Sequence, residues 1–566
     1  MIKLIPAVKH METYGNFFCA QTICFEENNL DSRLLHALKK LPCDKAGARL
    51  DISIAGHTGE GYELYINEND IRIKADGPAG AFYAIQTLRQ IFKNSEIPCL
   101  YIKDFPDFEY RGFYQDVTRG KIPTMETIKK LIDQMAYYKL NSLQLYVEHT
   151  FEFEEYKQLR ETTGYLTKEA LLEIGAYCKE NFIDFIPSLS TFGHLYELLE
   201  QPQYRHLRVL KDFDAPINFW DNRMMHHTID PENPESIALI ESLIDQYIPC
   251  FESEWFNICC DETFDLHTYD ALGIDSGKLY VEFVKKIIAH VQKRGKKVMM
   301  WADILLKYPH TIDRIPAGTC FLNWNYSADP PEEKVIRLAE TGETQIVCPG
   351  TASWSRLCES VGRGEPNICR MAEYGYAHGA KGVLNTNWGD WGNPCSLELG
   401  MYGMVLGAEK SWSVDSELND EFYRAVNTLL YGSENGIQSL KAVSELHEHM
   451  AWKQFCQNYF AHRYENGEGM EFISEDEVKL IQKGCREIIE KLFGDRWEND
   501  EYRKELLIAT EGICVMAELS AKLAGYDVTR VTDTHEWLKR YSESWMRKNK
   551  ASELYRIKEM FEYYHY

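Results

Sequence analysis

The feature that most constrains the fold is an alternation of short apolar segments with helical segments, repeated eight times between residues 106 and 412. The apolar segments are rich in β-branched and aromatic residues, which is typical of parallel strands buried on both faces. They cover residues 111–117, 141–148, 182–190, 255–262, 296–303, 320–326, 344–350 and 382–388. Eight strand–helix units over about 300 residues predict an α/β fold of the (β/α)₈ barrel type. A doubly wound open sheet is the alternative, although it more often has fewer strands.

Two regions of different pattern flank the predicted barrel. Residues 1–105 hold short alternating strands, with a hairpin turn expected over Asn67–Asp70, followed by a helix with an apolar stripe over residues 79–92. This pattern predicts a small α+β domain. Residues 413–566 are charged and helical in pattern, and we expect a separate helical region there.

The helices and connections of the predicted barrel carry local signals as well. Pro123 is expected in the first turn of one helix, and Gly295 marks the end of another. Residues 367–382 are expected to form a further helix. The connection from His194 to Glu254 is unusually long, so we expect it to make an excursion over the active face of the barrel.

Composition narrows the classes of function. Lys and Arg number 62 against 87 Asp and Glu, so the formal net charge is −25 and a nucleic-acid partner is disfavoured. The 16 Cys are scattered without a C-x-x-C pair, which argues against a disulfide scaffold or a structural zinc site. The first residues lack the pattern of a secretory signal, and no apolar run approaches the ~20 residues that cross a bilayer. We therefore expect a cytoplasmic protein without membrane contact, metal or organic cofactor, and the sequence is compatible with a homo-oligomer.

Polar and aromatic residues gather where the predicted strands end. In such barrels the catalytic groups project from the carboxyl ends of the strands. Carboxylates, histidines and four tryptophans converging on one rim are typical of a site that grips and cleaves a sugar. The candidates are Asp116, Glu148, His149, His194, Asp261, Glu262, Trp301, Asp303, Asn323, Trp324, Tyr326, Trp354, Asn387, Trp388 and Asp390.

Each candidate also has a plainer interpretation. Asp116 and Arg119 form either a structural ion pair beneath the site or part of the substrate contacts, and His194 could be a turn histidine after Gly193. Any single tryptophan is more often core than ligand platform, and Tyr326 could pack or donate its hydroxyl. A metal site built from Glu148, His149, His194 and Asp261 lacks tight ligand spacing.

The adjacent carboxylates Asp261 and Glu262 are the sharpest feature. They follow an otherwise apolar strand, where two charges are unfavourable unless a site uses them. Consecutive strand residues point to opposite faces, so both can reach one ligand only where the strand is ending. Like charge and apolar surroundings should raise the pKa of one of them and leave it protonated near neutrality, as a general acid requires. A helix-capping pair is the alternative.

These motifs together resemble glycoside hydrolase family 20, the β-N-acetylhexosaminidases. Residues 61–92 resemble the small domain that precedes the family's barrel, YRGFYQDVTR resembles its first-strand motif, and NICCDE resembles its H-x-G-G-D-E strand. LYVEHTFEF and IPSLSTFGH resemble the hexosaminidase D-like branch, which leans toward N-acetylgalactosaminides over N-acetylglucosaminides. Asn257, Ile258, Cys259 and Cys260 stand where the family has His-x-Gly-Gly, and Glu148-His149-Thr150-Phe151 replaces its Asp-Asp-Gln-Gly loop.

The resemblance implies a retaining exo-β-N-acetylhexosaminidase, acting on terminal β-linked GalNAc or GlcNAc of a small glycan or glycoside, in which the substrate's 2-acetamido oxygen is the nucleophile. By this match Glu262 is the general acid and base, and Asp261 stabilises the acetamido group. Arg111 and Asp390 would bind sugar hydroxyls. Trp301, Trp324 and Trp388 would form the pocket wall, and Tyr326 or Trp354 would lie at the acetamido carbonyl.

Two other functions fit the same residues. A two-carboxylate glycosidase would pair Glu262 with Glu148 or Asp390 and would not need a 2-acetamido group. A carbohydrate-binding pseudoenzyme would bind without turnover, although the presence of both Asp261 and Glu262 argues against it.

Overall fold

The computed structural model describes residues 2–27, 30–159, 164–211, 218–225 and 227–565. Its centre is a closed barrel of eight parallel strands in the order β10-β11-β12-β13-β14-β7-β8-β9. The strands are β7 (Tyr110–Asp116), β8 (Ser142–Val147), β9 (Asp184–Leu189), β10 (Trp255–Asn257), β11 (Lys297–Trp301), β12 (Cys320–Trp324), β13 (Gln345–Cys348) and β14 (Gly382–Asn387). The predicted (β/α)₈ barrel is confirmed, and pairing of β14 with β7 closes it, which excludes the open sheet.

Helices surround the barrel, and their ends follow local capping chemistry. They include α3 (Met125–Tyr137), α5 (Lys168–Glu180), α8 (Pro234–Tyr247), α10 (Ser276–Lys293), α11 (Asp303–Lys307), α12 (Glu333–Ala339), α13 (Val361–Ala377) and α14 (Met401–Trp412). The side chain of Thr124 accepts the N–H of Thr127 and caps α3, so Pro123 precedes the helix rather than lying in its first turn. Helix α13 begins at Val361, six residues before the expected start, and contains Pro366.

The barrel interior is filled by large side chains of the strands rather than forming a pore. Tyr114, Tyr146, Met299, Trp301 and Leu322 are among its members, and each is at most 1% exposed. Such layers of inward residues make the barrel a packed core. The carboxyl end of the barrel therefore offers a rigid floor for a site.

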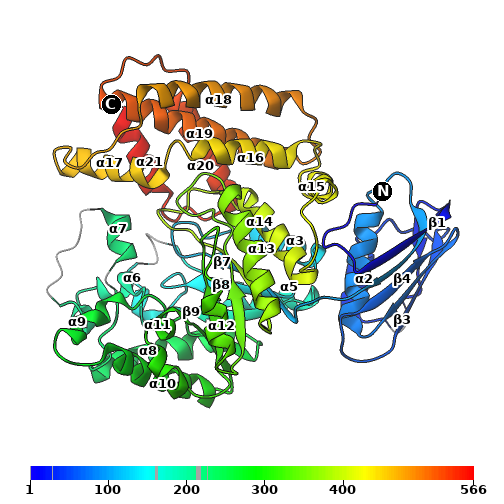
Figure 1. Cartoon of the computed structure of the whole chain (residues 1–566), viewed down its shortest axis with the longest axis horizontal. Helices are drawn as coiled ribbons and strands as arrows, with labels where there is room; N and C mark the ends of the chain where they lie inside the picture. The colour runs from blue at the N-terminus through cyan, green and yellow to red at the C-terminus, as the bar shows by residue number, and fades with distance from the viewer. Residues whose placement is uncertain (1, 28–29, 160–163, 212–217, 226, 566) are drawn as a thin grey trace.

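The N-terminal region is a six-stranded sheet in the order β1-β6-β4-β5-β3-β2. Its elements are β1 (His10–Phe17), β2 (Ile23–Cys24), α1 (Ser32–Leu38), β3 (Ala48–Ile54), β4 (Tyr62–Ile66), β5 (Asp70–Ala75), α2 (Pro78–Ile91) and β6 (Pro98–Asp104). The expected hairpin is present, because β4 and β5 pair antiparallel and the N–H of Asn67 donates to the carbonyl of Asp70 at 2.9 Å. Figure 1 shows this sheet beside the barrel, with α2 on its inner face.

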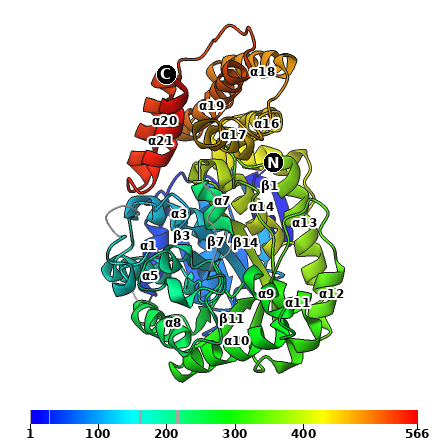
Figure 2. The ribbon, with the colours of Figure 1, turned by 90° about the vertical axis from the view of Figure 1, so that its left-hand side faces the viewer.

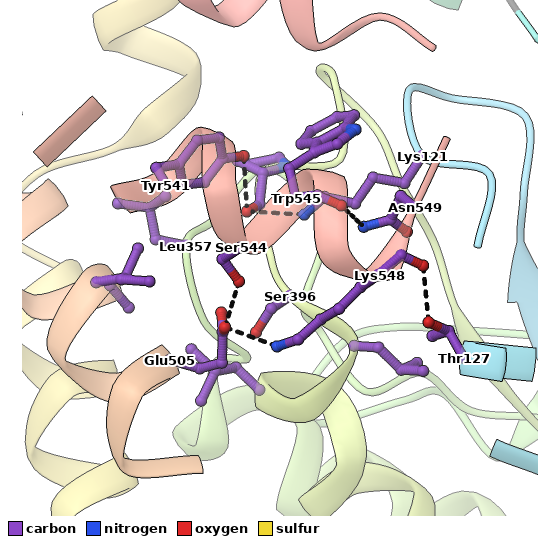
Figure 3. Close-up of a pocket in the computed structure, with 15 residues that line it drawn as sticks. Lys121, Thr127, Leu357, Ser396, Glu505, Tyr541, Ser544, Trp545, Lys548 and Asn549 are labelled. Carbon is purple, nitrogen blue, oxygen red and sulfur yellow. Dashed lines mark hydrogen bonds and ion pairs between the residues drawn. The ribbon is translucent and has the colours of Figure 1, made fainter. Parts of the chain in front are cut away.

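The C-terminal region is helical, as predicted. It comprises α15 (Asp420–Val426), α16 (Gly436–His447), α17 (Trp452–Tyr464), α18 (Glu475–Gly494), α19 (Asp500–Ala524), α20 (Thr534–Lys548) and α21 (Leu554–His565). Figures 1 and 2 place these helices, coloured yellow to red, together on one side of the barrel. Lys548 of α20 forms ion pairs with Glu398 at 2.9 Å and with Glu505 at 2.6 Å. Figure 3 shows Lys548 and Glu505 at the wall of a cavity. The pair of Lys548 with Glu398 thus joins the helical region to the barrel, whereas the pair with Glu505 lies within the helical region.

The long connection between β9 and β10 contains α6 (Tyr196–Leu199), α7 (Phe219–Met224) and α8. Figures 1 and 2 show α7 on the side of the barrel that faces α17. Among the residues that the structure describes, no helix combines the length and apolar character needed to span a membrane.

Candidate active site

Strand β10 ends earlier than the sequence predicts, and this places the adjacent carboxylates. The strand stops at Asn257 instead of continuing to Glu262, because Cys259, Cys260 and Glu262 have left-handed backbone with φ of 57°, 66° and 47°. The turn that results sends both Asp261 and Glu262 into one cavity at the carboxyl end of the barrel.

Buried hydrogen bonds hold this left-handed turn. The N–H of Cys259 donates to the side-chain oxygen of Asn257 at 2.9 Å, and its carbonyl accepts from the N–H of Trp301 at 3.0 Å. The hydroxyl of Tyr280 donates to the carbonyl of Cys260 at 2.8 Å. Strained backbone of this kind persists where its surroundings fix it, and it clusters at functional sites.

His194 lies between the two carboxylates. Its Nε2 is 3.3 Å from Oδ2 of Asp261 and 3.2 Å from Oε2 of Glu262. Burial opposes a charge on the ring, but Asp261 and Glu262 outweigh burial and raise the pKa of His194 well above its ordinary value. The preceding residue is Gly193, where a Cβ would come within 2.5 Å of the carbonyl oxygen of Asp261. His194 therefore binds the two acidic side chains into one charge cluster.

The two carboxylates differ in their access to solvent. The side chain of Asp261 is 10% exposed and that of Glu262 is 27% exposed. A proton donor must reach both the leaving group and water, whereas an electrostatic stabiliser acts best when it is shielded from water. The geometry thus suits Glu262 for proton transfer and Asp261 for stabilising a positive charge.

Asp303, the first residue of α11, supports the turn from the neighbouring strand. Its Oδ2 accepts the backbone N–H of Glu262 at 3.0 Å. Burial of the carboxyl group, followed by the charge of Asp261, raises the pKa of Asp303 to about 7. Asp303 was one of the candidates at the ends of the predicted strands. Nothing in the sequence indicated that its side chain would accept the backbone N–H of Glu262.

The pKa of Asp303 gives a prediction about stability. An unfolded aspartate titrates near 3.9, so between about pH 4 and pH 7 the folded protein binds this proton more tightly than the unfolded chain. The contribution of Asp303 to the free energy of unfolding therefore falls as the pH rises from about 4 to about 7. We expect the free energy of unfolding of the wild type, relative to Asp303→Asn, to fall by at least about 1 kcal/mol from pH 4.5 to pH 7.5. Denaturant unfolding at the two pH values measures this, with Asp415→Asn at an exposed position as control; an unchanged difference would contradict it.

Arg119 is the arginine of the pocket, and the expectation for Arg111 is wrong. Arg119 follows the carboxyl end of β7, lines the cavity, and its Nη1 lies 2.7 Å from Oδ1 of Asp390. Arg111 is the second residue of β7, so it lies at the opposite, amino end of the barrel. There it is fully buried and forms a two-pronged ion pair with Glu60 of the N-terminal domain, at 2.7 and 2.9 Å. Arg111 joins the two domains and does not meet a ligand in the pocket.

Asp116 and Glu148 lie beneath Arg119 and do not line the cavity. Oε1 of Glu148 is 3.3 Å from Nε of Arg119 and accepts the hydroxyl of Tyr146 at 2.8 Å. Asp116 accepts the backbone N–H of Gly389 at 3.0 Å, and burial raises its pKa to about 6. The structural ion pair weighed for Asp116 and Arg119 is present as a longer contact of 3.8 Å, while Arg119 itself reaches the cavity.

His149 is a further candidate that does not line the cavity. It is 2% exposed, packs against Tyr156 at 6.2 Å between ring centres, and burial lowers its pKa. A buried neutral imidazole behind the rim does not contact a sugar in the pocket.

Aromatic rings form the opposite wall. The lining residues there are Trp324, Tyr326, Trp354 and Trp388. Trp324 and Tyr326 are stacked with ring centres 5.1 Å apart, and Trp388 Nε1 donates to the hydroxyl of Tyr326 at 2.7 Å. Trp301, which the sequence placed in the pocket wall, is instead fully buried and does not line the cavity; its ring centre is 6.0 Å from that of Trp388. These flat apolar faces suit the C–H face of a pyranose ring.

Met224 of α7 also lines the cavity, and no feature of the sequence predicted that it would. It confirms that the long connection reaches the active face. The cavity has a volume of about 530 Å³ including its open mouth, which lies within the range of small-molecule sites.

The charges of the site favour a cationic species. Six carboxyl groups surround two cationic side chains: Asp116, Glu148, Asp261, Glu262, Asp303 and Asp390 around Arg119 and His194. Ligand atoms of His194, Asp261 and Glu262 lie within 4.8 Å of one another. A metal would need the Nε2 lone pair of His194, but the facing carboxylates raise the pKa of His194 and so favour the protonated ring, which has no lone pair to offer. The cluster therefore suits the stabilisation of positive charge on a ligand.

Comparisons with known proteins give matches along most of the barrel and the N-terminal domain. The sequence model described as "Glycosyl hydrolase family 20, catalytic domain" matches residues 108–367, and the model described as "Glycosyl hydrolase family 20, domain 2" matches residues 3–105. A β-hexosaminidase of Vibrio furnissii is 23% identical over 428 residues, which cover 65% of this chain and 66% of that protein. A β-hexosaminidase of Porphyromonas gingivalis is 26% identical over 415 residues, which cover 63% and 50%. The chain thus spans half to about two thirds of the length of these two relatives.

Solved structures share the fold. A family 20 exo-β-N-acetylglucosaminidase of Vibrio harveyi, in complex with N-acetylglucosamine, superposes with a TM-score of 0.59 at 18% identity and covers 77% of this chain and 78% of its own. A chitobiase of Flavobacterium johnsoniae superposes with a TM-score of 0.61 at 17% identity and covers 96% and 95%. At these identities the likeness concerns the fold.

Proposed function

Because the chain belongs to glycoside hydrolase family 20, we propose that it hydrolyses terminal β-linked N-acetylhexosaminides with retention, using the substrate's 2-acetamido oxygen as nucleophile. The observation that carries this proposal is the cluster of Asp261, Glu262 and His194 facing a wall of indole and phenol rings across one cavity. The β-hexosaminidases among the relatives agree with it.

The other carboxylates of the site argue against a protein nucleophile. Glu148 and Asp390 are the partners that a two-carboxylate mechanism would use. Glu148 is 3% exposed and is engaged by Arg119 and Tyr146, and Asp390 is bound to Arg119 at 2.7 Å. A carboxylate held by a guanidinium is a poor nucleophile, so an attacking group on the substrate is the simpler alternative.

The residues then take separate roles. Glu262 protonates the departing glycosidic oxygen and later deprotonates the attacking water. Asp261 accepts the acetamido N–H and stabilises the positive charge of the cyclised intermediate. An intramolecular nucleophile that is already in place avoids much of the entropy loss of a bimolecular step.

Tyr326 would hold the acetamido carbonyl. Its hydroxyl oxygen accepts the N–H of Trp388, and an indole N–H can only donate. The hydroxyl hydrogen of Tyr326 is therefore directed to another acceptor, and an acetamido oxygen against the aromatic wall would be one. Trp324, Trp354 and Trp388 would pack on the sugar and its methyl group.

Arg119 and Asp390 would bind the sugar hydroxyls at the far side of the cavity. The pair presents donors and acceptors together, which is what a ring with several neighbouring hydroxyl groups requires. GalNAc and GlcNAc differ in one axial hydroxyl, and the hexosaminidase D-like motifs favour GalNAc.

Matched aryl glycosides test this proposal. We expect turnover of aryl β-N-acetylgalactosaminide or β-N-acetylglucosaminide, and kcat/KM at least about 10³-fold lower on the corresponding aryl β-galactoside or β-glucoside, because these lack the internal nucleophile. Equal turnover of the plain glycosides would favour the two-carboxylate mechanism. Binding of all of them without turnover would favour a carbohydrate-binding protein.

A further inference from the structure

The loop that carries Asp390 has an unusual backbone. Trp391, Gly392 and Asn393 follow Asp390 directly and have φ of 61°, 84° and 49°. Two of these are not glycine, and left-handed backbone is uncommon for other residues. Such a loop keeps its shape only when the surrounding structure fixes it. The contacts of residues 389–395 therefore decide where the carboxylate of Asp390 lies.

The barrel supplies the support from below. Nζ of Lys121, just after β7, donates to the carbonyl oxygens of Cys395 at 2.6 Å and Pro394 at 3.2 Å. Lys121 is 7% exposed, and burial lowers its pKa to about 8. A Cβ at Gly120 would lie 2.6 Å from the carbonyl oxygen of Gly392, so the two chain segments are in direct backbone contact.

The C-terminal helices supply the remaining support. Tyr541 of α20 donates its hydroxyl to the carbonyl of Pro394 at 3.1 Å. Trp452, the first residue of α17, donates its Nε1 hydrogen to the carbonyl of Trp391 at 2.9 Å. Both side chains are buried, at 5% and 0% exposure, and Figure 3 shows Tyr541 beside Lys121 at the cavity under the loop. These two bonds hold the first left-handed residue, Trp391, and the residue that follows the last one, Pro394.

The C-terminal helical region also contacts α7, another segment that contributes a residue to the cavity lining. Trp220 of α7 packs on Gly392, so that a Cβ there would come within 3.0 Å of the indole. Arg223 of α7 forms ion pairs of 2.6 Å with Glu553, which precedes α21, and of 2.7 Å with Glu197. Arg223 and Glu553 are each 3% exposed. The helix that presents Met224 is thus tied to the C-terminal region through a buried charge pair.

We propose that the C-terminal helices complete the sugar-binding site, with Trp452 and Tyr541 as positioning residues that hold Asp390 against Arg119. This inference rests on the proposed contact of Asp390 with the sugar. Trp452 and Tyr541 act on the substrate only through the loop, because neither lines the cavity.

Substitutions that remove the hydrogen-bond donors of Trp452 and Tyr541 test the inference. We expect Trp452→Phe combined with Tyr541→Phe to raise KM for an aryl N-acetylhexosaminide about 5- to 10-fold with kcat changed less than about threefold, because ground-state and transition-state binding weaken together. Trp537→Phe and Tyr564→Phe are the matched controls. Each removes a buried side-chain bond to a backbone carbonyl within the helical region, of 2.9 Å to Ile508 and 3.4 Å to Phe455. We expect KM to stay at the wild-type value in both controls.

A cycle with Asp390→Asn separates positioning from general destabilisation. In the Asp390→Asn background, Trp452→Phe and Tyr541→Phe should raise KM no further, because residues that act through one group are not additive. An equal rise of KM in both backgrounds, or no rise in either while Asp390→Asn alone raises KM, would overturn the inference and leave the proposed function standing. An Asp390→Asn enzyme with wild-type KM would overturn the proposed contact of Asp390 and this inference with it. Melting temperatures of all variants show whether a change in KM accompanies loss of fold.

Discussion

Replacement of Glu262 by glutamine is expected to lower kcat/KM about 10³-fold on substrates with poor leaving groups, such as alkyl N-acetylhexosaminides, within the usual range of general acid assistance. On dinitrophenyl glycosides the loss should stay below about tenfold, since such leaving groups depart without a proton. The kcat/KM ratio is the right quantity, because it reports the steps up to departure of the leaving group. The difference between the two substrate classes is the signature of a proton donor.

The control for Glu262→Gln is a glutamate at the other end of the same strand. Glu254 immediately precedes β10 at the opposite end of the barrel, where it pairs with Lys297 at 2.8 Å. Glu254→Gln makes the same chemical change without touching the cavity, and both substrate classes should react as in the wild type. Equal losses on alkyl and dinitrophenyl substrates in Glu262→Gln would deny Glu262 the acid role.

Replacement of Asp261 by asparagine is expected to slow both substrate classes alike, by about 10²–10³-fold in kcat, which is the usual effect of removing one preorganised electrostatic partner. Asp261 faces His194. In the proposed mechanism it stabilises the charge that develops in the sugar ring and the acetamido group, so its effect should not depend on the leaving group. A loss confined to poor leaving groups would instead make Asp261 the proton donor and reverse the two roles.

Much of the architecture could be predicted from the sequence because hydrophobic burial repeats along the chain. Eight apolar segments separated by helical ones give the barrel, and the alternation around Asn67–Asp70 gives the hairpin of the first domain. The position of Asp261 and Glu262 at a strand end also followed from burial, since two adjacent charges cannot lie within a strand that is buried on both faces.

The backbone conformation at the end of β10 could not be predicted from the hydrophobic pattern. Cys259 and Cys260 look like two more buried strand residues, yet both have left-handed backbone. The resemblance gave a clue, because these positions correspond to the two glycines of the family motif and glycine is the residue that adopts this conformation most readily. Backbone conformation of this kind depends on long-range partners such as Asn257, Tyr280 and Trp301.

The two arginines near β7 show a second feature that was not predicted correctly from the sequence. Arg111 and Arg119 lie eight positions apart in the sequence, Arg111 at the start of β7 and Arg119 just after its end. The direction of the strand shows that Arg119 lies at the carboxyl end of the barrel. The family resemblance nevertheless suggested Arg111 as the arginine that binds sugar hydroxyls. Contacts between segments that are distant in the sequence could not be predicted either. The bonds from Trp452 and Tyr541 to the loop of Asp390 join positions 61 and 147 residues apart.

Inhibition by a thiazoline analogue of the cyclised N-acetylhexosamine measures most directly whether the substrate supplies the nucleophile. The thiazoline reproduces the fused ring that the acetamido oxygen would form at the anomeric carbon. We expect competitive inhibition of the wild type at least about 10²-fold tighter than by the free N-acetylhexosamine, as for a mimic of the reaction's high-energy species, and a large loss of this affinity in Asp261→Asn. A thiazoline that binds no better than the free sugar would contradict substrate assistance and return the attacking role to a carboxylate of the protein.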